Sequence, residues 1–464
     1  MSLRRLVARS LSTADLSGRL RSLSTADLAG RLRRSLSTAA THPPWAIIHD
    51  TSEVDRSSSA PGARFRPVAP PGVSHIFAPA HLIDPTQRPN AGTSDDVLQY
   101  LGGNVVQLLF GNVGAASGDG HLLLSYHDLR AEGPCTRWDL AENPEVHRFV
   151  CNPLTGQMLR LPDFGGSRRI FALHSMGLLT QAGGGLGCGP PDRFAVAEFV
   201  LNGAAIVRFL SEEGKWNAVR PVHGNPSLPR PIEMNQETVA FGGRLWWVDL
   251  TLGAVSVDPF ADQPEIRFVE LPSGSVLPAP ARVDEADPCK VEERGLLIME
   301  VTNRRRIGVS EGRLRYAEVT PGGPFLLSSY ALDDDDDEGT GWKLEHQVAL
   351  RQVLADGGYS AQAAPQIAVL DPVHANIIYL KVGKDVVVVD MHNGNVIGGC
   401  RLQGEYVSLV PCVLPHWLGS SRIPAEGTYQ SSYVSVLHLL VHCLRCSVLA
   451  WAEFYTTVET YTNG

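Results

Sequence analysis

The chain of 464 residues lacks the short motifs that carry a known catalytic mechanism. It has no Gly-x-Ser-x-Gly elbow, no His-Glu-x-x-His pair and no cysteine in a known catalytic context, and its 15 histidines are scattered. Sequence spacing does not exclude Ser, His and Asp side chains that converge only in the fold. The sequence therefore predicts no catalytic residue, no cofactor or cofactor-binding residue and no metal ligand.

The chain also lacks the features of a secreted protein. No apolar core of seven or more residues follows the basic start, as a signal peptide requires. The Asn-x-Ser pattern at Asn225 is blocked as a glycosylation site by Pro226. The eight cysteines are spread over a long chain, which indicates free and mostly buried thiols in a reducing compartment.

Positive charge is scarce outside the first 42 residues. That segment holds eight Arg against Asp15 and Asp27, which leaves 32 basic and 47 acidic residues, a net charge of −15, in the remainder. An acidic body repels phosphate backbones, so no nucleic-acid partner is expected. The run Arg304, Arg305 and Arg306 leaves a local basic patch open as an alternative.

Residues 1–42 contain a duplication, because RSLSTADLSGRL at 9–20 recurs as RSLSTADLAGRL at 21–32. The segment is rich in Arg and Ser and poor in acids, and a helix would gather its leucines loosely on one side. This composition predicts an organelle transit peptide, with mitochondria favoured over plastids because Arg is so abundant. The alternatives for this segment are a disordered tail or a gene-prediction artefact of a duplicated exon. The alternative locations are cytoplasmic and nuclear.

Strands joined by turns dominate residues 43–428. Three strands follow one another in 241–271. The first runs from Arg244 to Leu250, the second follows a turn at 251–253 and ends at Asp258, and the third runs from Ile266 to Leu271. GRLWWVDL at 243–250 is echoed at 312–319 and 376–383, a spacing near 65 residues. We therefore predict an all-β fold, a β-propeller of about six four-stranded antiparallel blades, with a sandwich as the alternative.

Further strands and turns support this fold. Strands are expected at 121–127, 205–210, 325–332 and 385–390, and Asx turns at Asn152-Pro153, Asp258-Pro259 and Asp371-Pro372. Trp216 and Trp342 lie 126 residues apart, close to two repeats. Trp246, Trp247, Asp249 and Asp258 are predicted to pack between blades and close turns rather than form a site.

Three segments resemble binding sites, and each has a plainer interpretation. The glycines of 183–189 lack the Lys-Ser/Thr of a phosphate loop and indicate a loop between strands. The acidic run 333–338 lacks the ligand spacing of a calcium loop and indicates a solvated loop. His438, His442, Cys443 and Cys446 could not surround one zinc ion from a single helix. The tail 429–464 is divergent, and its apolar stretch 433–455 is interrupted by Arg445, so no membrane anchor is expected.

The stretch GRLWWVDL followed by VDPFADQPEIRFVELP resembles the core motif of the plant domain of unknown function 1618 family, which is expanded in grasses. Supporting fragments occur at 44–48, 149–162, 192–199, 212–216 and 411–428. That family resembles F-box-associated and kelch-like β-propellers, whose Asn-Pro-x-Thr-Gly segment is echoed by 152–156. The resemblance implies a platform that binds proteins, and it transfers no catalytic residue.

The sequence thus predicts a non-enzymatic scaffold with an unidentified protein partner. One alternative is a propeller enzyme with a site at the central channel, which would need convergent acidic or histidine side chains. Another is a substrate adaptor without an F-box, since the residues before Trp45 do not have the regular apolar positions of that motif.

Overall fold

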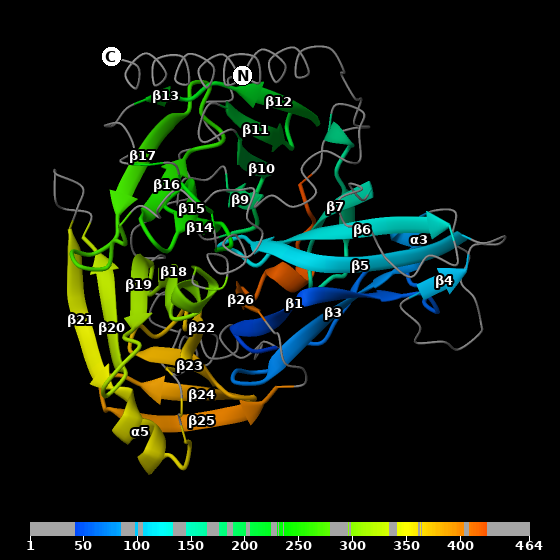
Figure 1. Ribbon diagram of the computed structural model, residues 1–464. Helices are drawn as coiled ribbons and strands as arrows, with labels where there is room; N and C mark the ends of the chain where they lie inside the picture. Colours follow the sequence, from blue (N-terminus) through cyan, green and yellow to red (C-terminus); the bar gives the residue numbers. More distant parts are fainter. Residues whose placement is uncertain are drawn as a thin grey trace, which may run out of the picture. The chain divides into compact units, whose positions relative to one another are not determined.

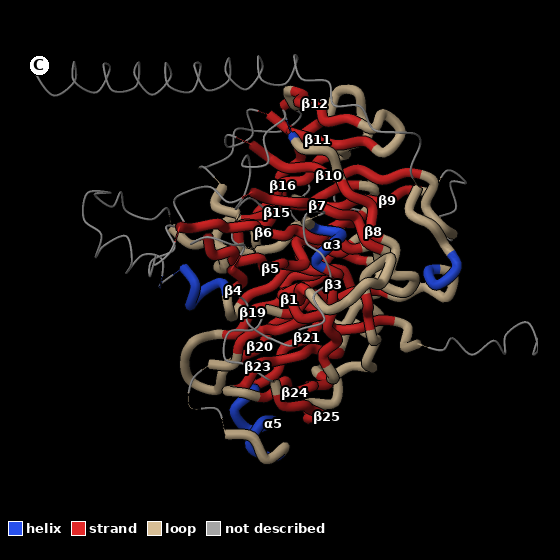
Figure 2. Tube along the Cα trace, turned by 90° about the vertical axis from the view of Figure 1, so that its right-hand side faces the viewer, coloured by secondary structure: helices blue, strands red, loops and turns tan. Residues whose placement is uncertain are grey.

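In the computed structural model, the regular blades are made of consecutive strands, each hydrogen-bonded to the next. The structure describes residues 42–84, 98–100, 105–132, 145–164, 176–182, 189–200, 205–223, 230, 232–234, 236–278, 296, 298–333, 341–360, 362, 364–402 and 408–424. Strands make up most of this part, and helices are short (Figure 2). Three of these are α3 (Ala80–Ile83), α5 (Leu350–Asp356) and the 3-10 turn η4 (Leu418–Ser420).

Four sheets are four-stranded antiparallel meanders at their core, here called blades 3 to 6. Blade 3 contains β9 (Gly177–Gln181), β10 (Arg193–Val200), β11 (Ala205–Leu210) and β12 (Lys215–Val219). Blade 4 contains β14 (Val239–Phe241), β15 (Arg244–Asp249), β16 (Gly253–Val257) and β17 (Glu265–Glu270), with β13 (Val222–His223) added parallel to β17. Blade 5 contains β18 (Arg305–Ser310), β19 (Arg313–Val319), β20 (Leu326–Leu332) and β21 (Trp342–Ala349). Blade 6 contains β22 (Gln366–Leu370), β23 (Ile377–Val382), β24 (Asp385–Asp390) and β25 (Asn395–Arg401).

The remaining strands form one nine-stranded sheet that joins two blades, here called the closing sheet. Blade 1 contains β26 (Leu409–Val413), β1 (Trp45–Asp55), β3 (Val73–Pro79) and β2 (Arg64–Phe65). Blade 2 contains β5 (Val105–Ala116), β6 (Leu122–Glu132), β7 (Glu145–Cys151) and β8 (Met158–Arg160), with β4 (Leu98–Tyr100) paired to β5. The two blades are joined because β1 also pairs with β5 at Thr51 and Ser52. The β1–β3 pair is parallel, a departure from the uniform antiparallel blades that we predicted.

The innermost strands of the six blades close a ring. The strand β26 lies against β5 and β22, and the series continues from β5 through β9, β14 and β18 back to β22 (Figure 1). Six apolar cores fill the contacts between successive blades, from blades 1 and 2 around to blades 6 and 1. The last described strand thus pairs with the first in one blade. This arrangement confirms the predicted β-propeller.

The predicted repeat corresponds to one blade. The three related segments at 243–250, 312–319 and 376–383 contain β15, β19 and β23, the second strands of blades 4, 5 and 6. Trp216 and Trp342 lie on the outer strands of blades 3 and 5, two blades apart as their spacing predicted. The predicted strands at 121–127, 205–210, 325–332 and 385–390 are confirmed as β6, β11, β20 and β24.

Side-chain alternation on β15 joins blade 4 to both of its neighbours. Trp247 is fully buried in the core shared with blade 3, where its ring lies 5.5 Å from that of Phe199. Trp246 points to the opposite face and packs in the core shared with blade 5. The structure therefore places both tryptophans between blades, as predicted.

The three predicted Asx turns are also present. Asn152 Oδ1 accepts hydrogen bonds from the N–H groups of Leu154 and Thr155, and Asp371 Oδ1 accepts them from Val373 and His374. Asp258 Oδ1 accepts one from Phe260 N–H at 2.9 Å.

Asp249 closes the turn between β15 and β16. Its Oδ1 accepts hydrogen bonds from both the N–H and the hydroxyl of Thr251. The predicted role of Asp249 in a turn is thus also confirmed.

Several predictions fall outside the described residues. These are the Arg-rich extension up to residue 41, most of the glycine loop and the acidic run, the cluster from His438 to Cys446 and the tail 429–464. The strands on either side of the glycine loop are β9 and β10, and those around the acidic run are β20 and β21. By its internal contacts the chain divides into Met1–Pro43 and Pro44–Gly464. In the part that the structure describes, no helix has the length and hydropathy to cross a membrane.

Candidate functional site

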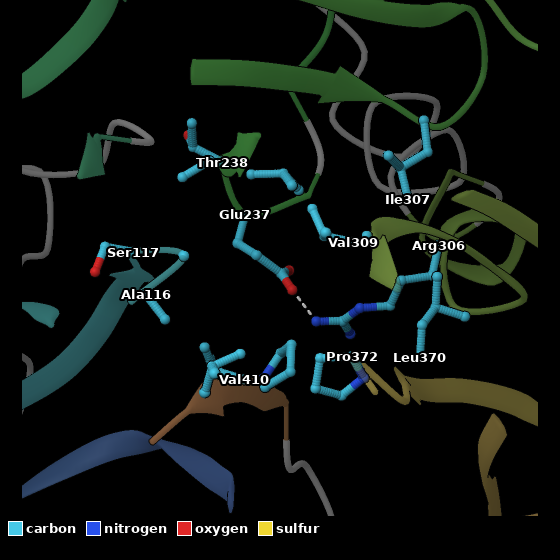
Figure 3. Close-up of a pocket in the computed structure, with 16 residues that line it drawn as sticks. Ala116, Ser117, Glu237, Thr238, Arg306, Ile307, Val309, Leu370, Pro372 and Val410 are labelled. Carbon is cyan, nitrogen blue, oxygen red and sulfur yellow. Dashed lines mark hydrogen bonds and ion pairs between the residues drawn. The ribbon is translucent and has the colours of Figure 1, made fainter. Parts of the chain in front are cut away.

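A pocket lies among the innermost strands, at the centre of the ring. It holds about 640 Å³ of empty space, part of it open to solvent. Its walls come from five blades: the end of β5, the segment 237–240 leading into β14, residues 306–309 of β18, the end of β22, and β26 (Figure 3). The inner strands of a propeller bring residues that are far apart in sequence to one axis, which explains how a single pocket draws on so many segments.

An ion pair crosses this pocket. Arg306 extends from β18 and its Nη2 donates to the Glu237 carboxylate, which comes from blade 4 (Figure 3). The same Nη2 donates to the carbonyl oxygen of Leu409 on β26, at 2.9 Å. One guanidinium therefore connects blades 4, 5 and 1, and it does so beside the strand that closes the ring.

The electrostatics of the pair follow from its burial. Removal from water disfavours the charged guanidinium and lowers the pKa of Arg306 to about 10. That value still leaves Arg306 charged at neutral pH, so the pocket contains a cation and the carboxylate that faces it. Removing one partner of such a pair leaves the other charge buried alone, which typically costs about 3–5 kcal/mol.

The rest of the wall is mainly apolar. Val239, Val309, Leu370 and Val410 each come from a different blade, and all four line the pocket. Among the described residues, no three His, Cys, Asp or Glu side chains come close enough together to hold a metal ion. The described wall thus favours binding of an apolar group near one ion pair, and it presents no set of convergent acids and histidines.

The alternative of a local basic patch at Arg304 to Arg306 is not found, because the three side chains separate. Arg304 pairs with Glu300, whereas Arg305 donates to the carbonyl oxygens of Leu250 and Ser275. Arg306 points to the channel instead. Alternation along β18 and the contacts that each arginine makes with a different segment explain why three consecutive cations form no common surface.

Sequence reasoning did not find Glu237 or Arg306 as site residues. Glu237 lies in a stretch without any motif, and Arg306 was interpreted only as part of a charge run. The one available signal was an Arg directly before the apolar run that begins at Ile307, since a charge at the start of a buried strand needs a partner. That signal gives neither the partner nor the channel.

The described cysteines agree with the predicted free thiols. Cys151 and Cys412 are buried and Cys400 is partly buried, and none of the three forms a disulfide. Burial raises the pKa of Cys151 to about 12, so this thiol stays protonated and unreactive at neutral pH.

Comparison with solved structures gives proteins of low similarity, one of them described as a β-propeller domain. The Myceliophteria_thermophila Cps50 (Swd1) β-propeller domain is 10% identical, with 60% of this chain and 82% of that chain covered and a TM-score of 0.27. Apo AztD from Citrobacter koseri is 12% identical, covers 79% of this chain and 97% of its own, and has a TM-score of 0.28. The Aleuria aurantia lectin is 10% identical, with 62% and 78% covered and a TM-score of 0.29. Similarities this low give no information about the function of this protein.

No curated protein sequence matches the chain significantly. A family model described as "Protein of unknown function (DUF1618)" matches residues 247–387, from β15 of blade 4 to β24 of blade 6. The match contains Trp247 and the segment VDPFADQPEIRFVELP on which the sequence resemblance was based, whereas the supporting fragments from 44–48 to 411–428 lie outside it. Residues 247–387 are thus similar to the DUF1618 family of unknown function, and this matching region lies in blades 4 to 6 of the β-propeller.

Proposed function

We propose that this protein is a non-enzymatic scaffold that binds a protein partner. The observation that supports it most directly is the composition of the channel. An enzyme of this fold needs convergent groups that donate and accept protons or hold a metal, and these lie at the axis where the innermost strands meet. The described part of that wall offers apolar side chains and one ion pair, whose arginine also contacts a backbone carbonyl.

The rigidity of the ring also supports a scaffold. Six interblade cores and the pairing of β1 with β26 hold the described strands, and thus the points from which loops leave them, in one framework. Loops held by a rigid framework are the usual place for recognition of partners. The resemblance to F-box-associated and kelch-like propellers would make a substrate adaptor without an F-box one form of this function.

Proximity labelling with the full chain tests the proposal. We expect a reproducible set of labelled proteins that an unrelated β-propeller with the same tag does not label. The same set should be labelled by the Glu237→Gln variant, which alters the channel and leaves the loops at the rims intact. Labelling that equals the control propeller would count against the scaffold.

The competing function is an enzyme with its site in the channel. Glu237 is the one described carboxylate that lines the pocket, so any proton transfer there would depend on it. A catalytic activity of the purified protein that is lost in the Glu237→Gln variant would favour the enzyme and overturn the proposed function.

We further propose that residues 1–42 direct the protein to mitochondria. The support is the composition of this segment, with eight Arg, two acidic residues and the repeated RSLST units. A fusion of residues 1–45 to a fluorescent protein should be mitochondrial, and a version with all eight Arg changed to Gln should not. A diffuse signal from the unchanged fusion would remove the claim.

A further inference from the structure

The guanidinium of Arg306 is only partly used by the protein. A guanidinium has five N–H donors, and both contacts of Arg306 are made by Nη2. Nε and Nη1 have no acceptor among the described residues. The Arg306 side chain lines the pocket and keeps 11% of its surface exposed. Donors are therefore available for an acceptor that enters the pocket.

The walls around these donors suit an apolar group. Val239, Val309, Leu370 and Val410, from four blades, line the same pocket as the guanidinium. The pocket wall is mostly apolar with a few placed polar groups, which is the usual composition of small-molecule sites. Burial of an apolar body against these walls would be favourable by about 25 cal/mol for each Å² removed from water.

We propose that the central pocket binds a small organic acid, with its carboxylate on the unpaired N–H groups of Arg306 and its apolar body against the valine and leucine side chains. Charge-assisted hydrogen bonds between a guanidinium and a carboxylate are about twice as strong as neutral ones. The site is distinct from the loops that the proposed scaffold would use, so either proposal can fail without the other.

The charge of Glu237 repels such a ligand, so the direction in which its removal changes binding tests the inference. The pair of Arg306 and Glu237 is neutral, so a bound carboxylate adds an uncompensated negative charge close to Glu237. Neutralising Glu237 should therefore tighten the binding of an acid, whereas neutralising Arg306 should abolish it. A ligand held only by apolar contacts would respond to neither change.

Isothermal titration calorimetry on the full chain, with 4-phenylbutyrate and its uncharged analogue 4-phenylbutanamide as probes, tests the inference. We expect the acid to bind at least about 10-fold more tightly than the amide, since a hydrogen bond to a charged group contributes on the order of 1.5–3 kcal/mol. Glu237→Gln should strengthen acid binding by about 5-fold or more, and Arg306→Gln should weaken it by about 10-fold or more.

The matched control is Arg313→Gln, which removes an arginine that pairs with Glu345 on the outer strand of blade 5. This variant should bind the acid like the unchanged protein. If Arg306→Gln does not fold, the proposal is still tested by the comparison of acid with amide and by the direction of the Glu237→Gln effect. Equal binding of acid and amide, weaker acid binding by Glu237→Gln, or no binding of the acid would overturn the inference.

Discussion

Blades 3 to 6 and the closing sheet are built in different ways. In the regular blades, each core strand pairs with the strand that follows it in sequence, through turns closed by glycines and Asx residues. In the closing sheet, Trp45 pairs with Val413, and Asn152 donates hydrogen bonds to residues 266 or more positions away. The regular blades show what local sequence can specify, and the closing sheet shows what depends on distant contacts.

The largest effect is expected for Trp247→Ala in a regular blade. Its side chain is fully buried between blades 3 and 4, so truncation leaves a cavity and should cost about 3–5 kcal/mol in the free energy of unfolding. The control is Trp342→Ala, at the outer edge, where the indole N–H donates to the Glu270 carbonyl oxygen at 2.7 Å. Denaturant unfolding should show a clearly smaller loss for Trp342. Equal losses would mean that interblade packing is not the main source of stability.

Asn152→Ala should come next, and it affects the closure. The Asn152 side-chain amide is fully buried, and its Nδ2 donates to the carbonyl oxygens of Leu418 and Ser421 while its Oδ1 closes a turn. We expect a loss of about 2–4 kcal/mol, because several buried partners are left unpaired at once.

The matched control for this change is Asn376→Ala, which removes a hydrogen bond to Asp390 inside blade 6. That variant should lose only about 1 kcal/mol. Limited proteolysis should cut after β26 faster in the Asn152 variant and at the usual rate in the Asn376 variant. Similar behaviour of the two variants would show that the closing segment is not held through Asn152.

Acid should destabilise the closing sheet through His127 on β6. Burial, helped by the nearby Arg148 charge, lowers the pKa of His127 from 6.5 to about 4. Its Nδ1 has no hydrogen-bond partner in the described structure, and its ring stacks on Phe110. The unfolded chain takes up a proton first, so stability is fully present above pH 6.5 and falls as the pH drops toward 4.

The loss from this one group should reach about 2–3 kcal/mol near pH 4, since each unit of pKa difference corresponds to about 1.4 kcal/mol. The variant His127→Phe keeps an aromatic ring against Phe110 and cannot titrate. Unfolding curves between pH 7 and 4, a range set by the two pKa values, should therefore be flatter for the variant. Identical pH dependence would place the acid sensitivity elsewhere.

The smallest effect is expected for the local turns of the regular blades. Asp371→Ala removes the acceptor for two backbone N–H groups and should cost about 1 kcal/mol or slightly more. Asp258→Ala removes the acceptor for Phe260 N–H and should cost less. Thermal unfolding compares the two directly. A loss for Asp371 as large as that for Asn152 would contradict the distinction between local turns and closure.

The sequence was most informative where physical rules act locally. Alternation on β15, the run of four valines on β24 and the Asx-Pro turns all appear in the structure at the predicted positions. These predictions hold because strand pleating and turn hydrogen bonds depend on neighbouring residues.

The candidate site shows the opposite situation. Arg306 and Glu237 are 69 residues apart, and Leu409 is 103 residues beyond Arg306. No spacing rule connects these three, because they meet only when the inner strands of blades 1, 4 and 5 face one axis. The parallel pairing of β1 with β3 and the addition of β13 to blade 4 were also beyond local patterns.

The sequence by itself determined that this protein would be a series of short antiparallel strands repeated about every 65 residues, because side-chain alternation and turn chemistry are encoded in adjacent residues. Only the tertiary structure decided how the ring closes and which side chains face its centre. The physical reason is that ring closure and a buried ion pair are each set by contacts between segments whose separation in the chain carries no information about their distance in space.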